Sequence, residues 1–189
     1  MSKLVCGIGF NSKGEYKTYL NGKRAYTTWY NMIRRCYDPE YHEKRPTYLD
    51  CHVCDEWLDY QCFAQWYENQ TYNHKGYEID KDLLMPKNKI YSPETCCFVP
   101  SQLNSLLVDC GSVRGEYPQG VSFDRIAKGF QAHINFNGKR KKLGCFDDPK
   151  EAYQVYKAAK ERHVKNEALK WANSIQWEVF VALMNWELS

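Results

Sequence analysis

The sequence has no apolar stretch of the roughly eighteen residues that a membrane-spanning helix requires, so we expect no transmembrane helix. Its first residues, MSKLVCGIGF, lack both a long apolar segment and a cleavage site, so we expect no secretory signal. These two absences predict a cytoplasmic protein. The nine cysteines then indicate reduced thiols or metal ligands, because a disulfide framework is typical of secreted chains.

A strong net charge is also absent, because the 189 residues carry only +3 at pH 7. The charge is unevenly distributed along the chain. Residues 1–50 hold nine Lys and Arg against five Asp and Glu, residues 51–100 hold four against eight, and residues 112–170 hold thirteen against seven. Two basic regions around an acidic middle suit a protein that contacts DNA through two separate parts of its chain. They suit equally a chain whose charges have no special role.

Residues 120–146 carry the clearest pattern in the chain, that of three short strands. Gly120–Asp124 is a candidate first strand. Gly129–Phe136 alternates between apolar and polar side chains, as a half-buried strand does. Asn137-Gly138 predicts a tight hairpin turn, because both central residues of that turn need positive φ. Lys139–Phe146 returns as the third strand.

A helix is predicted directly after the third strand. Asp148 suits its N-cap, Pro149 its first helical position, and Glu151 can complete a capping box. The apolar residues at helical spacing are Ala152, Val155, Tyr156 and Ala159. They are expected to cover the apolar face of the sheet, on which the middle strand places Phe130, Ala132, Ile134 and Phe136.

The other face of the sheet is then left polar. The residues on or beside it that can contact phosphates or base edges are Arg125, Lys128, Gln131, His133, Asn135, Arg140 and Lys142. Because a sheet can enter the major groove as a helix does, this face is a candidate DNA-binding site. The alternative is an ordinary solvated sheet face, since exposed strand positions are usually polar.

This stretch also resembles the AP-two/ERF DNA-binding domain of plants and its phage and mobile-element relatives. The matching pieces are Gly120–Phe123, Phe130–Ile134, Leu143–Phe146, Asp147–Ala152 and the Tyr156…Ala159-Lys160 helix. The resemblance implies a DNA-binding module over residues 111–170, built as a three-stranded antiparallel sheet packed on one helix. The sequence departs from the plant pattern at Cys145, where Thr or Ser is usual, and this implies no loss of DNA contact.

The first fifty residues carry fewer signals. Turn-forming residues at Asn11–Gly14 and Asn21-Gly22 predict a short hairpin between Glu15 and Ala25. Thr28–Tyr37 has apolar residues at helical spacing and is predicted to be a helix that Asp38-Pro39 ends.

Residues 51–110 predict a helix followed by a strand, a loop, a second strand and another helix. The first helix is expected over Asp55–Tyr67 and the first strand over Tyr77–Leu84. The second strand ends at Pro100, and Ser101–Val108 is the following helix. The strand, loop, strand and helix have the ββα order of the HNH nuclease fold.

The residues of this region resemble the HNH-like proteins common in phages and prophages. The matching pieces are Trp29…Met32…Arg35-Cys36-Tyr37, Pro46-Thr47-Tyr48, Val53–Trp57…Phe63…Trp66-Tyr67, Ile79–Asp82, Tyr91–Cys96 and Val99-Pro100…Asn104. An HNH-like region, here residues 1–110, followed by an AP-two-like segment is the arrangement of many homing endonucleases of mobile elements. The resemblance implies double-stranded DNA as the partner and the cytoplasm of a bacterial host as the location.

An HNH nuclease needs a general-base His at the end of the first strand, and an Asp with a helix His or Asn to hold one divalent metal ion. Carried onto this sequence, the base position falls on Lys81, and the loop Asn that orients the base corresponds to Thr95. Asp80 and Asn104 match the metal-ligand positions. A lysine with a pKa of about 10.4 is protonated at neutral pH and makes a poor base. The resemblance thus implies a vestigial catalytic site.

Two interpretations of that site stay open, because fold alone does not decide activity. In the first, Asp80, Lys81 and Asp82 are solvated residues at a strand end, and the protein binds DNA without cutting it. In the second, Asp82 or His74 replaces the missing base, and the protein is a Mg²⁺-dependent HNH-type endonuclease or nickase.

Four cysteines are candidate zinc ligands: Cys51, Cys54, Cys96 and Cys97. The second pair is adjacent in sequence, and adjacent side chains on a strand point to opposite faces, which disfavours a single zinc site. Buried free thiols are the alternative. The sequence therefore commits to no cofactor, with Mg²⁺ implied only by the nuclease interpretation.

The C-terminal residues 171–189 are more apolar than the rest of the chain. Within them, Trp171–Leu188 has apolar residues at helical spacing and is predicted to be a helix. Such a helix either packs on the core of its own chain or forms an interface with a second copy or another protein, since its apolar side would otherwise be exposed.

The whole sequence predicts an α+β protein with a linker at Asp109–Gln119 between the HNH-like region and the DNA-binding module. The function that it favours is sequence-specific binding of double-stranded DNA by a phage or mobile-element protein derived from a homing endonuclease. The alternatives are the metal-dependent nuclease and a partner-binding protein that antagonises a host system.

Overall fold

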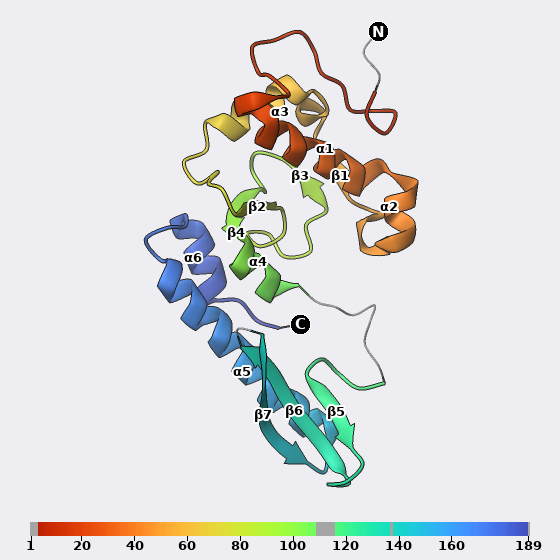
Figure 1. Cartoon of the computed structure of the whole chain (residues 1–189), viewed down its shortest axis with the longest axis vertical. Coiled ribbons are helices and arrows are strands. Elements are labelled where there is room, and N and C mark those ends of the chain that lie inside the picture. The colour runs from red at the N-terminus through yellow and green to blue at the C-terminus, as the bar shows by residue number, and fades with distance from the viewer. Residues whose placement is uncertain (1–3, 109–115, 137, 189) are drawn as a thin grey trace. The chain divides into compact units, whose positions relative to one another are not determined.

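The structure, a computed structural model, describes residues 4–108, 116–136 and 138–188 of the chain (Figure 1). The fold is α+β, as the sequence predicts. None of the helices in these ranges is long and apolar enough to cross a membrane. The predicted linker Asp109–Gln119 lies largely outside the described residues.

Contacts within the chain divide it into two compact units. The first comprises Met1–Ser101 and Ser174–Val179, and the second comprises Gln102–Asn173 and Phe180–Ser189. Each unit has strands and a buried apolar cluster of its own.

The first unit combines helices with short strands. Its helices are η1 (Leu20–Gly22), α1 (Lys23–Tyr37), α2 (Pro39–Lys44), η2 (Pro46–Tyr48), η3 (Asp55–Leu58) and α3 (Tyr60–Glu68), where η marks a 3₁₀ helix. Its strands are β1 (His52–Val53), parallel to β3 (Ile90–Tyr91), and β2 (Tyr77–Asp80), antiparallel to β4 (Cys97–Pro100). The predicted succession of strand, loop, strand and helix is confirmed, because α4 (Ser101–Leu107) follows β4 directly.

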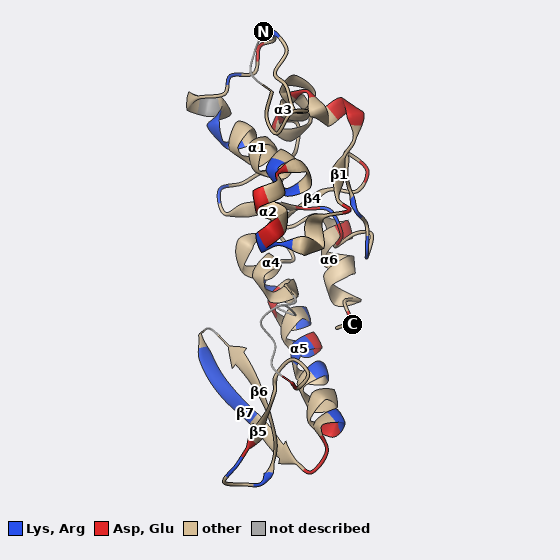
Figure 2. Ribbon diagram, turned by 90° about the vertical axis from the view of Figure 1, so that its right-hand side faces the viewer, with Lys and Arg blue, Asp and Glu red and all other residues tan. Residues whose placement is uncertain are grey.

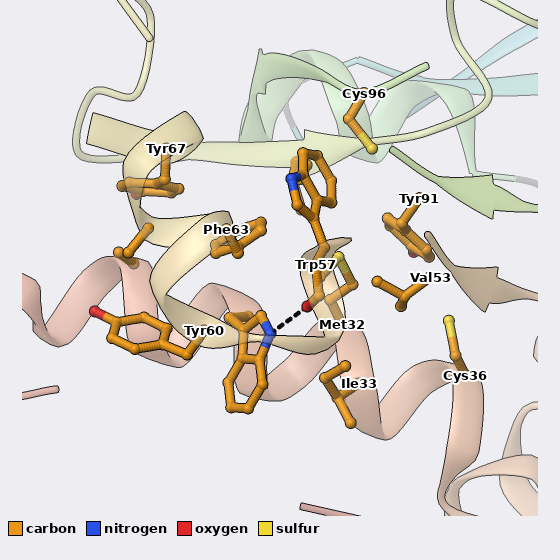
Figure 3. Packing of buried hydrophobic residues seen from close by; sticks show 14 of the residues in the cluster. Met32, Ile33, Cys36, Val53, Trp57, Tyr60, Phe63, Tyr67, Tyr91 and Cys96 are labelled. Carbon is orange, nitrogen blue, oxygen red and sulfur yellow. Dashed lines mark hydrogen bonds between the residues drawn. The ribbon is translucent and has the colours of Figure 1, made fainter. Parts of the chain in front are cut away.

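The core of the first unit is aromatic (Figure 3). Helix α1 supplies Trp29, Met32 and Ile33, which pack with Trp57 and Phe63, and all five are 1% exposed or less. The indole nitrogen of Trp29 donates a hydrogen bond of 2.7 Å to the carbonyl oxygen of Trp57, drawn as a dashed line in Figure 3. The rings of Trp57 and Phe63 meet edge to face with their centres 5.1 Å apart. Packing and a buried hydrogen bond thus join α1 to the η3–α3 segment.

The hairpin predicted between Glu15 and Ala25 is wrong, because this stretch leads through η1 into α1. The Tyr60 hydroxyl donates a hydrogen bond of 2.7 Å to the carbonyl oxygen of Lys17. The Gln61 side chain accepts from the backbone nitrogen of Tyr16 and donates to its carbonyl oxygen, both at 3.0 Å. Because side chains of α3 satisfy these backbone groups, the segment does not need to pair with itself.

Two further elements are shorter than predicted, in each case at an aspartate. The helix expected over Asp55–Tyr67 is divided at Asp59, which has an extended backbone and caps α3 with its carboxylate. The strand expected over Tyr77–Leu84 ends at Asp80, whose carboxylate accepts two backbone N–H groups of the following turn. Aspartate ends both elements because its side chain competes for backbone donors.

The second unit is a three-stranded antiparallel sheet with a long helix beside it (Figure 1). The strands β5 (Val121–Asp124), β6 (Gly129–Phe136) and β7 (Lys139–Phe146) neighbour one another in that order. Helix α5 covers Pro149–Trp171. The predicted bounds of β6 and β7 are confirmed, and β5 starts at the residue after the predicted one.

Local signals at the helix start and the hairpin turn behave as predicted where they are described. The Asp148 carboxylate caps α5 by accepting a hydrogen bond of 2.9 Å from the backbone nitrogen of Lys150. Gly138 has a φ of +75°, the left-handed geometry that the predicted turn needs. Its partner in that turn, Asn137, lies outside the described residues.

The helix covers one face of the sheet. Two adjoining clusters combine Phe130, Ala132, Ile134 and Phe136 of β6 with Ala152, Val155, Tyr156 and Ala159 of α5. The predicted apolar faces of strand and helix are therefore confirmed. Gly120, just before β5, has a φ of +76°, and a Cβ there would lie 2.1 Å from the Tyr156 ring, so only glycine fits this approach.

The predicted C-terminal helix is shorter than Trp171–Leu188. Helix α5 continues to Trp171, the segment Ala172–Gln176 contains turns, and α6 covers only Trp177–Met184. Asn and Ser within that segment favour turns over helix, because their side chains compete for backbone hydrogen bonds.

The end of the tail packs on the second unit's own core. Leu188 is 6% exposed and clusters with Ile134 and Tyr156. Its backbone nitrogen donates a hydrogen bond of 3.1 Å to the Glu161 carboxylate, and its carbonyl oxygen accepts one from Lys157. Core packing thus accounts for this part of the tail.

Candidate nucleic-acid interface

The pairing of β5, β6 and β7 assigns a set of polar side chains to the sheet face opposite α5. The pairs on it are Ser122 with Gln131, His133 with Lys142, and Asn135 with Arg140. Asp124 lies two residues beyond Ser122 and shares its face. We define the polar face as these seven residues: Ser122, Asp124, Gln131, His133, Asn135, Arg140 and Lys142.

Hydrogen bonds hold several side chains of the polar face in place. The Arg140 guanidinium donates to Nδ1 of His133 at 3.0 Å and to the Ser122 hydroxyl at 3.4 Å. The side-chain amide of Gln131 donates to the Asp124 carboxylate. Because neighbours already orient these groups, little conformational entropy remains to be lost when a partner binds.

Ionisation of the polar face follows from the same contacts. Partial burial, and then the Arg140 charge, lower the pKa of His133, so its ring is neutral at pH 7 and can accept the hydrogen bond from Arg140. Backbone hydrogen bonds from Ala127 and Ile126 hold the pKa of Asp124 below its ordinary value. Asp124 is therefore ionised and is the one carboxylate within the polar face.

Cations outnumber that carboxylate. Arg140 and Lys142 are exposed on the polar face, and Arg125 and Lys128 are exposed in the turn between β5 and β6. Figure 2 shows the blue of Lys and Arg over much of β7 and again at this turn. The polar face and its adjoining turn therefore present positive charge around amide and imidazole groups.

Strand alternation divides the basic run of β7 between the two faces of the sheet. Lys139 and Lys141 pair with residues of β6 whose side chains face α5, unlike Arg140 and Lys142. The ammonium group of Lys141 lies 6.0 Å from the centre of the Phe136 ring. One strand thus offers a matched pair of cations on each face.

Among the predicted nuclease residues, Asp80 is half-buried at the end of β2. One of its carboxylate oxygens accepts hydrogen bonds from the backbone nitrogens of Asp82 at 3.0 Å and Leu83 at 2.7 Å. Burial, and then the charge of Asp82, raise the pKa of Asp80 to about 6. Such a carboxylate is common in functional sites, but here its bonds also account for the turn that follows β2.

Lys81, at the position of the general base, is 6% exposed, and its ammonium group contacts three neighbouring residues. Its ammonium nitrogen lies 2.8 Å from the Asp82 carboxylate, 3.0 Å from the carbonyl oxygen of Asn88 and 5.7 Å from the centre of the Tyr91 ring. Burial lowers the pKa of Lys81, but the hydrogen bond and charge of Asp82 outweigh it, so the pKa is raised. A charged ammonium group with these partners stabilises the loop between β2 and β3 and does not accept a proton from water.

The other residues of the nuclease motif have local structural contacts. The Thr95 hydroxyl donates to the carbonyl oxygen of Ile90 at 2.8 Å and so fixes the loop before β4. The His74 ring packs edge to face on Tyr77, with the ring centres 5.4 Å apart. Asn104 is half-buried in α4 and belongs to the second unit, whereas Asp80 belongs to the first.

The residues in the described ranges do not fit a resident metal ion. The four zinc candidates are free thiols: Cys51, Cys54, Cys96 and Cys97. Burial raises the pKa of each of these thiols, so in this structure they are neutral side chains. No group of three or more His, Cys, Asp or Glu in the described ranges is placed to hold a metal ion, and this includes the surroundings of Asp80.

We expect Asp80→Asn to increase the free energy of unfolding at pH 7.5 by about 1–2 kcal/mol. This is less than the full pKa difference implies, because Asp80 is only half-buried and water screens its charge. A carboxyl whose pKa is higher in the folded than in the unfolded state destabilises the fold as pH rises from about 4 through about 6. Asparagine removes this charge and keeps an oxygen for the two backbone donors. Urea unfolding at pH 4 and pH 7.5 measures the difference.

Asp80→Ala is the control for this prediction, because it removes both the charge and the hydrogen-bond acceptor. We expect it to be less stable than the asparagine variant at both pH values. An asparagine variant that is less stable than the wild type at pH 7.5 would show that the carboxylate charge has a favourable partner.

Two polar-face residues were not predicted from the sequence, Ser122 and Asp124. The signal was present, because Val121-Ser122-Phe123-Asp124 alternates as β6 does.

Comparison of the chain with models of known protein families, with curated proteins and with solved structures finds no match.

Proposed function

We propose that this protein binds double-stranded DNA through the polar face of the β5–β6–β7 sheet. The observation that carries the proposal is the gathering of cations on a sheet face whose opposite side is covered by α5. Phosphates complement the Lys and Arg side chains, and base edges complement the Gln, His and Asn side chains between them.

The size of the sheet suits the major groove of B-form DNA. Neighbouring strands lie about 5 Å apart, so three strands span roughly 10 Å, whereas the groove is about 12 Å wide. Sheets and two-stranded ribbons are among the elements that read DNA in a groove.

Sequence specificity requires side chains whose hydrogen-bonding groups have a fixed direction. The amide nitrogen of Gln131 donates to the Asp124 carboxylate, so the side-chain oxygen of Gln131 is left as an acceptor. Asn135 is exposed beside Arg140, its partner across the strand pair. These side chains support sequence-specific rather than purely electrostatic binding. The further assignment to a phage or mobile-element protein derived from a homing endonuclease rests on the sequence resemblance alone.

A metal-dependent nuclease is the second candidate, and the raised pKa of Asp80 is the observation in its favour. The contacts of Lys81 count against it, because no general base stands at the required position. We therefore place DNA binding first and strand cleavage second.

The test is incubation of the protein with bacterial and phage genomic fragments, with and without Mg²⁺, reading both retention and cleavage. We expect a subset of fragments to be retained, with no strand breaks in either condition. Specific Mg²⁺-dependent nicks that Asp80→Ala or Asn104→Ala abolishes would establish the nuclease instead. Absence of any retention at low salt would overturn the proposed function.

A further inference from the structure

The turn between β5 and β6, residues 125–128, presents an isoleucine to solvent. Ile126 is 95% exposed, with Arg125 before it and Lys128 two residues after it. A single exposed apolar side chain is common on protein surfaces and carries no inference by itself. Its surroundings distinguish this one.

Contacts to Asp124 fix the shape of the turn. One oxygen of this carboxylate accepts hydrogen bonds from the backbone nitrogens of Ile126 at 2.9 Å and Ala127 at 3.2 Å. The other oxygen accepts the side-chain amide of Gln131, which belongs to the polar face. Lys128 adopts a φ of +52°, so the chain reverses direction sharply into β6. The apolar tip is thus held by the same carboxylate that orients a candidate base reader.

The charges around the tip are suited to a polyanion. Arg125 and Lys128 are exposed within the turn, and Lys142 on β7 lies close enough to influence Asp124 electrostatically. Duplex DNA offers both partners that this turn requires, because phosphates line each groove and flat apolar base surfaces lie between them. Proteins that insert apolar side chains between base steps place them among cations in this way.

We infer that the 125–128 turn is an insertion element, in which Ile126 packs against a base step of duplex DNA while Arg125 and Lys128 contact the flanking phosphates. This inference rests on the proposed DNA-binding function and adds a contact that the polar face does not make. Steps that unstack easily, such as pyrimidine–purine steps, are the expected sites.

Duplex binding by wild-type, Ile126→Ala and Leu169→Ala proteins at two salt concentrations tests the inference. Ile126→Ala should weaken binding about five- to thirty-fold without changing the salt dependence, because only apolar contact is lost. Leu169 is 56% exposed on α5 and serves as the matched control, so Leu169→Ala should bind as the wild type does. Duplexes labelled at both ends should bend less with Ile126→Ala than with the wild type.

The possible failures are distinguishable. If the wild type and Ile126→Ala bind and bend the duplex equally, the insertion element is overturned and the DNA-binding function stands. If the wild type fails to bind any duplex at low salt, both are overturned. Wild-type binding to anionic phospholipid vesicles in place of DNA, lost in Ile126→Ala, would assign the turn to a membrane surface and overturn the inference.

Discussion

Replacement of Trp29 by alanine is expected to lower the free energy of unfolding by about 3–5 kcal/mol. Trp29 is 1% exposed, and its ring centre lies 5.7 Å from those of Tyr26 and Tyr60. The substitution leaves a cavity among these rings and removes the donor of the buried hydrogen bond to Trp57. Because domains are typically stable by only about 5–15 kcal/mol, urea unfolding followed by circular dichroism should show a large shift.

Trp177→Ala is the matched control for this substitution. Trp177 is 70% exposed, so the same change of residue creates no comparable cavity. We expect a loss below about 1 kcal/mol. Equal losses in the two variants would contradict the placement of Trp29 at the centre of the first unit's core.

Removal of two cations from the polar face is expected to weaken DNA binding more than removal of two cations from the other face of the same strand. Arg140→Ala with Lys142→Ala should lower affinity about ten- to a hundred-fold at low salt. The slope of log affinity against log salt should flatten by about two units, because each phosphate contact contributes about 0.9. Fluorescence anisotropy with a retained genomic fragment measures both quantities.

The matched variant is Lys139→Ala with Lys141→Ala, which removes the same charge from the face that α5 covers. Its salt slope should change by less than about half a unit, because these ammonium groups point away from the polar face. Both variants are expected to stay folded, since all four side chains are exposed. Equal weakening by the two double variants would mean that DNA responds to diffuse charge rather than to one face of the sheet.

The sequence by itself determined the three-stranded sheet of the second unit and the start of its long helix. The alternation in Gly129–Phe136 assigned each side chain of β6 to a face, because successive strand residues point in opposite directions. Asp148 and Pro149 marked the start of α5, because the cap acts within one helical turn. These signals are readable because their causes lie within a few residues along the chain.

Only the tertiary structure decided the features that depend on residues far apart. Residues 15–25 resemble a hairpin in sequence, but in the structure Tyr60 and Gln61 of α3 form hydrogen bonds with their backbone. No local sequence pattern predicts such distant partners. Lys81 occupies the general-base position in the sequence, but in the structure its ammonium group is buried against Asn88 and Tyr91, which follow it in the chain. Periodicity records which way a side chain points, whereas burial and hydrogen-bond partners depend on which distant segments the packing brings to it.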